Sequence, residues 1–195
     1  MPNPNLSKSE RAHAKGQTPR CIWLTGLPGA GKTTIAHALE RELHARGRHV
    51  YVLDGDQLRT GLNADLGFTR AARAENVRRA SRVAQLMVDA GLIVICAFIS
   101  PYRSERGIVR SLFAPEEFLE VYLDASAAVC ESRDPKGHYA RARRGEMPDY
   151  TGIDGSYEPP EAPEMRLDTG HLSLEACLAL ILARLEIAKD ASRTG

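Results

Sequence analysis

The chain has 195 residues, of which 43% are hydrophobic and 26% are charged, and its formal net charge is +1. That length suits a single domain with its own buried core, and the composition is typical of a globular protein. A net charge this close to zero argues against a nucleic-acid partner, and the lack of a long apolar stretch or an N-terminal hydrophobic segment leads us to expect a cytoplasmic protein without a membrane partner.

The predicted elements begin after an N-terminal tail. Residues 1–19 are rich in Asn, Ser, Lys, Pro and Gly and have no apolar period, so we expect them to be disordered and residues 20–195 to form the domain. From Cys21 onward, short apolar runs alternate with amphipathic stretches. Strands are predicted at 21–25, 49–54, 92–99, 118–123 and 165–167, and helices at 32–46, 72–90, 103–113 and 174–188.

This alternation of strands and helices indicates an α/β fold. Residues 92–99 are apolar throughout, as in a strand buried on both faces of a parallel sheet. Right-handed crossovers then place helices on both faces, which gives a parallel sheet of about five strands in a three-layer fold. Residues from about 134 to 163 break the alternation, are rich in Arg, Gly, Pro and Tyr, and predict a lid segment.

The cysteines favour a reducing compartment. The chain has four of them, Cys21, Cys96, Cys130 and Cys177, widely spaced and without a C-x-x-C pair. Because three lie in apolar stretches, we interpret them as buried free thiols.

A glycine-rich motif predicts a site for nucleotide phosphates. Residues 26–33 fit the pattern G-x-x-x-x-G-K-[ST] between a predicted strand and a predicted helix. The glycines let backbone N–H groups surround the β-phosphate, the lysine reaches the β- and γ-phosphates, and the threonine hydroxyl binds Mg²⁺. The predicted ATP-binding residues are Gly26, Leu27, Pro28, Gly29, Ala30, Gly31, Lys32, Thr33 and Thr34.

The motif predicts the P-loop NTPase fold, but it does not by itself separate kinases from GTPases and motor ATPases. The chain has no Asn-Lys-x-Asp sequence of the kind that reads guanine in GTPases. Its small size and its lid segment favour a small-molecule kinase that uses ATP and Mg²⁺.

Two carboxylates follow the second predicted strand, at the sheet edge where the phosphate loop also lies. We assign Asp54 to the metal side and Asp56 to the acceptor hydroxyl, although the reverse assignment stays open. Arg59 lies one helical turn further on and suits an anionic acceptor.

Taken together, the motifs resemble the adenylylsulfate kinase family over about residues 21–170. The segments that carry the resemblance are 26–33, 54–59, 66–68, 73–76, 99–103, 130–137, 150–154, 157–160 and 167–169. The resemblance implies that ATP and adenylyl sulfate give ADP and 3′-phosphoadenylyl sulfate, in sulfate assimilation. It also implies Mg²⁺, a homodimer and a functional coupling to ATP sulfurylase.

The resemblance further implies roles for acceptor-side residues. Phe68 and Tyr150 would enclose the adenine, and Arg59 and Arg73 would hold the phosphosulfate. The remaining candidates are Asn76 for the ribose or phosphosulfate, Ile99 and Ser100 for the acceptor wall, and Ser100 also as the family's phosphoserine position. Direct in-line transfer would need no such covalent step.

In the lid segment the resemblance implies contacts to ATP. Arg133 would contact its base, and Lys136 and Arg141 are candidates to neutralise charge on the transferred phosphoryl group. For Arg143 and Arg144 a solvated basic face is an equal alternative.

Some positions depart from the family pattern. The loop has Pro28 in place of the usual serine, Ala72 replaces an aspartate that would orient Arg73, and Asp149-Tyr150 replaces a glycine followed by phenylalanine. The changes at Ala72 and Asp149 leave open another nucleotide-like anionic acceptor. A nucleotide-binding regulatory module without catalysis is a further alternative, which the intact Lys32 and Thr33 argue against.

Overall fold

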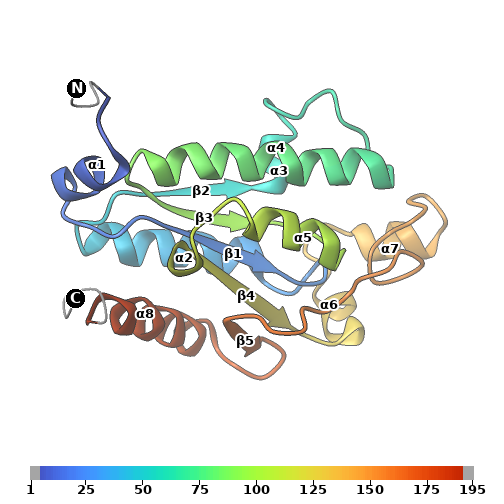
Figure 1. Cartoon of the computed structure of the whole chain (residues 1–195). Coiled ribbons are helices and arrows are strands. Elements are labelled where there is room, and N and C mark those ends of the chain that lie inside the picture. The colour runs from blue at the N-terminus through green and yellow to red at the C-terminus, as the bar shows by residue number, and fades with distance from the viewer. Residues whose placement is uncertain (1–4, 191–195) are drawn as a thin grey trace.

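The computed structural model describes residues 5–190, with side chains as far as Leu185. Its centre is a parallel sheet of five strands in the order β2-β3-β1-β4-β5 (Figure 1). The strands are β1 (Arg20–Thr25), β2 (Val50–Asp54), β3 (Ile93–Ala97), β4 (Phe118–Asp124) and β5 (Met165–Asp168). The predicted parallel α/β architecture is therefore confirmed.

Helices cover both faces of the sheet. They are α1 (Lys8–Ala14), α2 (Lys32–Ala45), α3 (Gly55–Leu58), α4 (Arg70–Asp89), α5 (Arg103–Arg110), α6 (Ala127–Arg133), α7 (His138–Arg143) and α8 (Leu174–Asp190). The 3₁₀ turn Pro115–Glu117 precedes β4. Within residues 5–190, none of these helices is long and apolar enough to cross a membrane.

Successive side chains of a strand point to opposite faces of the sheet, so the strands contribute to two hydrophobic cores, one on each face of the sheet. In β1, Ile22 and Leu24 pack with α2 and α8, whereas Cys21 and Trp23 pack with α4 and α5. All four cysteines are buried and free, as predicted. Because the strands are covered on both sides, their carboxyl ends are the edge left open for a site, and α6, α7 and the lid segment gather there (Figure 1).

The expectation of a disordered N-terminal tail is wrong for residues 8–19. Ser7 and Glu10 form a reciprocal capping box that starts α1, and Arg11 makes an ion pair of 2.5 Å with Asp89 at the end of α4. Gln17 is buried and bonds the backbone of His49 and Gly91. This segment therefore closes the amino-terminal end of the sheet, opposite the open edge. The expectation for residues 1–4 lies outside the described residues.

Candidate active site

The phosphate loop connects β1 to α2 and leaves no room for side chains at two of its glycines. A Cβ on Gly26 would lie 2.5 Å from the carbonyl oxygen of Leu123, and one on Gly29 would lie 2.7 Å from that of Cys130. Lys32 donates from Nζ to the carbonyl oxygens of Gly26 at 2.9 Å and Leu27 at 2.8 Å. The ammonium is thus held across the mouth of the loop, where it would meet an anion.

Burial lowers the pKa of Lys32 to about 8. The carboxylates of Asp54 and Asp56 act in the opposite direction, as does Cys130, but the loss of water contact is the larger effect. An ammonium held in such surroundings is stabilised by an added anion, which fits a phosphate-binding role.

Thr33 and Asp54 form an oxygen pair beside Lys32. The Thr33 hydroxyl donates to Oδ2 of Asp54 at 2.7 Å, while Oδ1 accepts from the backbone N–H groups of Asp56 at 2.8 Å and Gln57 at 3.4 Å. Asp54 thereby caps α3 and is buried. A fixed carboxylate next to a hydroxyl matches the oxygen ligands that Mg²⁺ takes, so these residues fit that ion.

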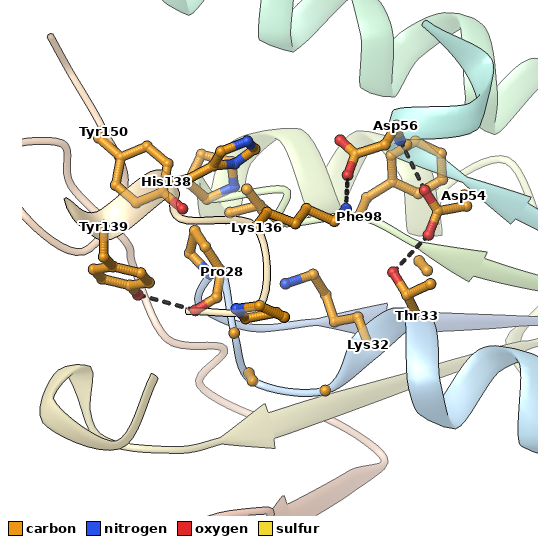
Figure 2. Close-up of a pocket in the computed structure, with 18 of the residues that line it drawn as sticks. Pro28, Lys32, Thr33, Asp54, Asp56, Phe98, Lys136, His138, Tyr139 and Tyr150 are labelled. Carbon is orange, nitrogen blue, oxygen red and sulfur yellow. Dashed lines mark hydrogen bonds and ion pairs between the residues drawn. The ribbon is translucent and has the colours of Figure 1, made fainter. Parts of the chain in front are cut away.

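Asp56 differs from Asp54 in exposure and in partner. Its side chain is exposed and is ion-paired with Lys136 of the lid segment. Figure 2 shows this pair closing one side of the pocket, with Lys32 pointing into the space below it. The two carboxylates therefore face different groups, which supports a division of tasks between them.

A single cavity of about 970 Å³ joins these residues to the lid segment. All predicted site residues line it except Gly26 and Leu27, whose carbonyl groups hold Lys32. The lining also includes residues that the sequence did not assign to the site: Thr69, His138, Tyr139, Leu172, Leu174 and Cys177. No short motif marks them: Thr69 caps α4, His138 and Tyr139 belong to the lid segment, and Leu172, Leu174 and Cys177 lie in the C-terminal region.

Two arginines, Arg59 and Arg73, also line the cavity. Arg59 donates to the carbonyl oxygens of Leu66 and Gly67, and its guanidinium lies 4.6 Å from the ring centre of Phe68. Burial lowers the pKa of Arg59, and the nearby charge of Arg73 lowers it further. Two positive groups that disfavour each other without a counterion make a site for an anion.

Arg73 keeps a defined pose even though Ala72 replaces the expected acid. Its Nε donates to the carbonyl oxygen of Phe68 at 2.9 Å, and its two terminal nitrogens approach Thr151 at 3.4 Å and the carbonyl oxygen of Asp149 at 3.3 Å. Asp149 adopts φ 55°, a left-handed conformation at the position where the family pattern has glycine. Backbone carbonyls from two loops thus replace the missing carboxylate.

The predicted aromatic pair has unequal surroundings. Phe68 is 61% exposed, whereas Tyr150 is 5% exposed and meets Tyr139 edge-on with ring centres 5.2 Å apart. Asn76 is buried, and its Oδ1 accepts from Asn63 Nδ2 at 2.7 Å, so its own amide N–H groups are left for a ligand. Asn63 is a supporting residue that the sequence did not reveal.

Ser100 is enclosed beneath the cavity floor. Its Oγ accepts from the indole N–H of Trp23 at 3.0 Å and donates to Thr25 Oγ1 at 3.1 Å, and the residue is 2% exposed with φ 38°. The Ser100 hydroxyl therefore both accepts from and donates to groups inside the protein, and these two bonds do not point toward a ligand.

The lid segment is attached to the phosphate loop. The Tyr139 hydroxyl donates to the carbonyl oxygen of Pro28 at 2.9 Å, and Arg133 donates to that of Thr169 at 2.6 Å (Figure 2 for the tyrosine). Arg143 pairs with Glu131, and both Arg141 and Arg144 pair with Glu146. Of this basic run, Arg141 lines the cavity, so the solvated-face interpretation suits Arg143 and Arg144.

Comparisons with known proteins agree with this geometry. The family model described as adenylylsulphate kinase matches residues 18–168. An adenylyl-sulfate kinase of Aeromonas salmonicida is 59% identical over 162 residues, which are 83% of each chain. The solved Mycobacterium tuberculosis APS kinase CysC, in complex with AMPPNP and APS, superimposes with a TM-score of 0.83 at 45% identity, covering 87% of this chain and 98% of that one.

A longer relative shows the same domain within a fusion. The bifunctional enzyme CysN/CysC of Xylella fastidiosa is 51% identical over 177 residues, which are 91% of this chain and 28% of the relative.

Proposed function

The chain belongs to the adenylylsulfate kinase family, and on that premise we propose that it transfers the γ-phosphoryl group of ATP to the 3′-hydroxyl of adenylyl sulfate. The products are 3′-phosphoadenylyl sulfate and ADP, which places the enzyme in sulfate assimilation. The observation that carries the proposal is one cavity lined both by the phosphate loop and by two arginines that contact an exposed aromatic residue, Phe68.

Residues around the phosphate loop would bind ATP and stabilise the transferred group. Lys32 and the loop amides would hold the β- and γ-phosphates, and Arg133 would contact the base. Thr33 and Asp54 would hold Mg²⁺, which when bound neutralises charge on the phosphates. Lys32 adds charge stabilisation where negative charge develops during transfer.

The acceptor would bind at the opposite end, with its adenine against Phe68 and Tyr150. Arg59 and Arg73 would hold the phosphosulfate by charge-assisted hydrogen bonds, and Asn76 would fix the ribose or the phosphosulfate. Burial raises the pKa of Tyr150 to about 12, so its hydroxyl stays neutral and could donate to an adenine bound beside it.

Asp56 would receive the proton that leaves the 3′-hydroxyl as its oxygen attacks the γ-phosphorus. Lys136 of the lid segment is paired with Asp56, so it would supply a second ammonium beside the reacting groups. Arg141, further along the lid segment, would add to this charge.

We infer that Ser100 shapes the acceptor wall and does not carry the phosphoryl group. Its hydroxyl is buried between Trp23 and Thr25, so a phosphate there would displace both. Direct transfer along the cavity requires no enzyme-bound intermediate.

Assembly and location are further proposals. We propose a homodimer in the cytoplasm, in which a second copy would cover exposed apolar side chains such as Leu86 of α4 and Ile108 of α5. The fused bifunctional relative supports a functional coupling to ATP sulfurylase, the enzyme that would supply adenylyl sulfate.

Product analysis tests the proposed reaction. The protein is incubated with Mg-ATP and adenylyl sulfate, and the phosphorylated product is identified by mass spectrometry and ³¹P NMR. The proposal predicts a phosphomonoester at the 3′ position together with intact phosphosulfate. A product phosphorylated elsewhere, or release of inorganic phosphate alone, would contradict it.

A further inference from the structure

A buried arginine outside the cavity joins three segments of the chain. Arg106 lies on α5 and is 3% exposed. Its guanidinium donates to the carbonyl oxygen of Ser100 at 2.6 Å and to that of Glu158 at 2.6 Å, and it makes a salt bridge of 2.9 Å with Glu120 of β4. A single side chain thus connects the loop after β3, the end of the lid segment and the sheet.

The loop after β3 forms the acceptor wall, which we define as residues 99–101. Each of its carbonyl oxygens accepts a hydrogen bond from a different part of the fold. The donors are Thr25 Oγ1 to Ile99 at 2.8 Å, Arg106 to Ser100, and the backbone N–H of Glu158 to Pro101 at 2.8 Å. All three wall residues line the cavity, whereas Arg106 stands behind them.

The wall is held in an unfavourable backbone conformation. Ser100 has φ 38°, which costs free energy for a residue other than glycine and persists only where the surroundings enforce it. Arg106 supports this conformation through a charge-assisted hydrogen bond from its buried guanidinium to the Ser100 carbonyl oxygen.

The same guanidinium fixes the returning end of the lid segment. Glu158 bonds both Arg106 and Pro101, and the neighbouring Tyr157 places its hydroxyl 3.0 Å from Thr25 Oγ1 and its ring 5.7 Å from the Arg106 guanidinium. The lid segment therefore returns to the sheet along the acceptor wall and not along the phosphate loop.

We propose that Arg106 is a positioning residue for the acceptor, which sets the shape of the acceptor wall and anchors the lid segment to it. This inference rests on the proposed function in one respect, that the wall receives adenylyl sulfate. Arg106 touches neither substrate site, so its effect falls on the acceptor and leaves ATP binding at the phosphate loop intact.

Arg110 provides a matched control from the same ion-pair network. It lies one turn later on α5 and bonds Glu120 at 3.1 Å and Glu164 at 2.9 Å. Arg106→Lys and Arg110→Lys are the same change beside the same Glu120, but Arg106 alone of the two bonds Ser100 and Glu158 in the described structure. Arg106 is the more buried of the two, so its variant can lose more stability, but a role limited to the Glu120 ion pair would leave acceptor kinetics and Trp23 emission unchanged in both variants.

Trp23 gives a signal that does not depend on the reaction. It is the single tryptophan of the chain, and its indole N–H bonds Ser100 Oγ. Movement of the wall therefore changes the emission of Trp23 and its quenching by acrylamide, with no ligand added.

The test measures steady-state kinetics and Trp23 emission for both variants. For Arg106→Lys we expect kcat/KM for adenylyl sulfate to fall about tenfold or more, KM for ATP to change less than about twofold, and Trp23 emission to shift. Arg110→Lys should leave all three near wild type. If Arg106→Lys does not fold, the pair Arg106→Met with Glu120→Gln, which removes both buried charges, is measured against the same expectations.

Equal behaviour of the Arg106 and Arg110 variants, or wild-type acceptor kinetics with unshifted emission in Arg106→Lys, would overturn the inference. Absence of turnover by the wild type with adenylyl sulfate would overturn the proposed function instead. In that case the emission of Trp23 still decides whether Arg106 sets the wall.

Discussion

Replacing Lys32 by methionine should change how the stability of the ligand-free protein depends on pH. The stem of the side chain keeps its length and apolar packing, but the ammonium is removed. In the wild type, burial lowers the pKa of Lys32 from its usual 10.5 to about 8. Because the folded state binds this proton less tightly than the unfolded state, the lysine destabilises the folded protein at neutral pH.

The size of the effect follows from the two pKa values. Below pH 8 both states are protonated, and the full difference corresponds to about 3 kcal/mol. As the pH rises through 8 toward 10.5, the folded state loses the proton first and stability is regained. Between about pH 7 and about pH 9.5 the relief is about 2 kcal/mol for a fully dry site, and we expect about 1 kcal/mol because the loop is open to water.

The assay is urea unfolding of wild type and Lys32→Met at both pH values. The variant also loses two hydrogen bonds to loop carbonyls, a loss that does not vary with pH, so the comparison uses the change between the pH values. We expect the wild type to gain about 1 kcal/mol more than the variant on going to high pH. If the free energy of unfolding changed equally with pH in the two proteins, the argument that burial lowers the pKa of Lys32 would be refuted.

ATP provides the functional counterpart in the same experiment. At about 100 times its dissociation constant, ATP should stabilise the wild type by about 2.7 kcal/mol near neutral pH. The variant should show little of this gain, because it lacks the group that the phosphates would satisfy.

Further substitutions probe separate parts of the site. Phe68→Ala should raise KM for adenylyl sulfate about tenfold without unfolding the protein, since the ring is exposed and stacking is worth about 1–3 kcal/mol; an unchanged KM removes Phe68 from the acceptor site. Tyr139→Phe loses the bond to Pro28 and should weaken ATP binding severalfold by titration calorimetry, with wild-type affinity as the contrary result. Ser100→Ala should lower thermal stability, because it leaves the Trp23 indole N–H unpaired at about 1–3 kcal/mol, yet it should retain turnover; complete loss of turnover in a folded protein would point to a phosphoserine.

The sequence predicted those parts of the molecule that are determined by residues close together in the chain. The phosphate loop is fixed by glycines, Lys32 and Thr33 within eight residues, and the continuous apolar run around β3 required burial on both faces. Asp54 and Asp56 were placed correctly at the sheet edge because Asp54 ends a strand and Asp56 comes two residues later.

Other parts depend on contacts between distant segments. Tyr139 bonds Pro28 across 111 residues, and Arg106 bonds Glu158 across 52, so neither pairing leaves a short motif. The ordered α1 was missed for a different reason. The Ser7 and Glu10 capping signal was present, but the polar composition around it outweighed that signal.

The most direct test of the central claim is a coupled ADP-release assay with Mg-ATP. Turnover is compared with adenylyl sulfate, with AMP and with no acceptor. The proposed function predicts that, of these three conditions, only the one with adenylyl sulfate gives fast ADP release. Only this acceptor carries a phosphosulfate that Arg59 and Arg73 would bind. ADP release no faster than the ATP-only background would contradict it.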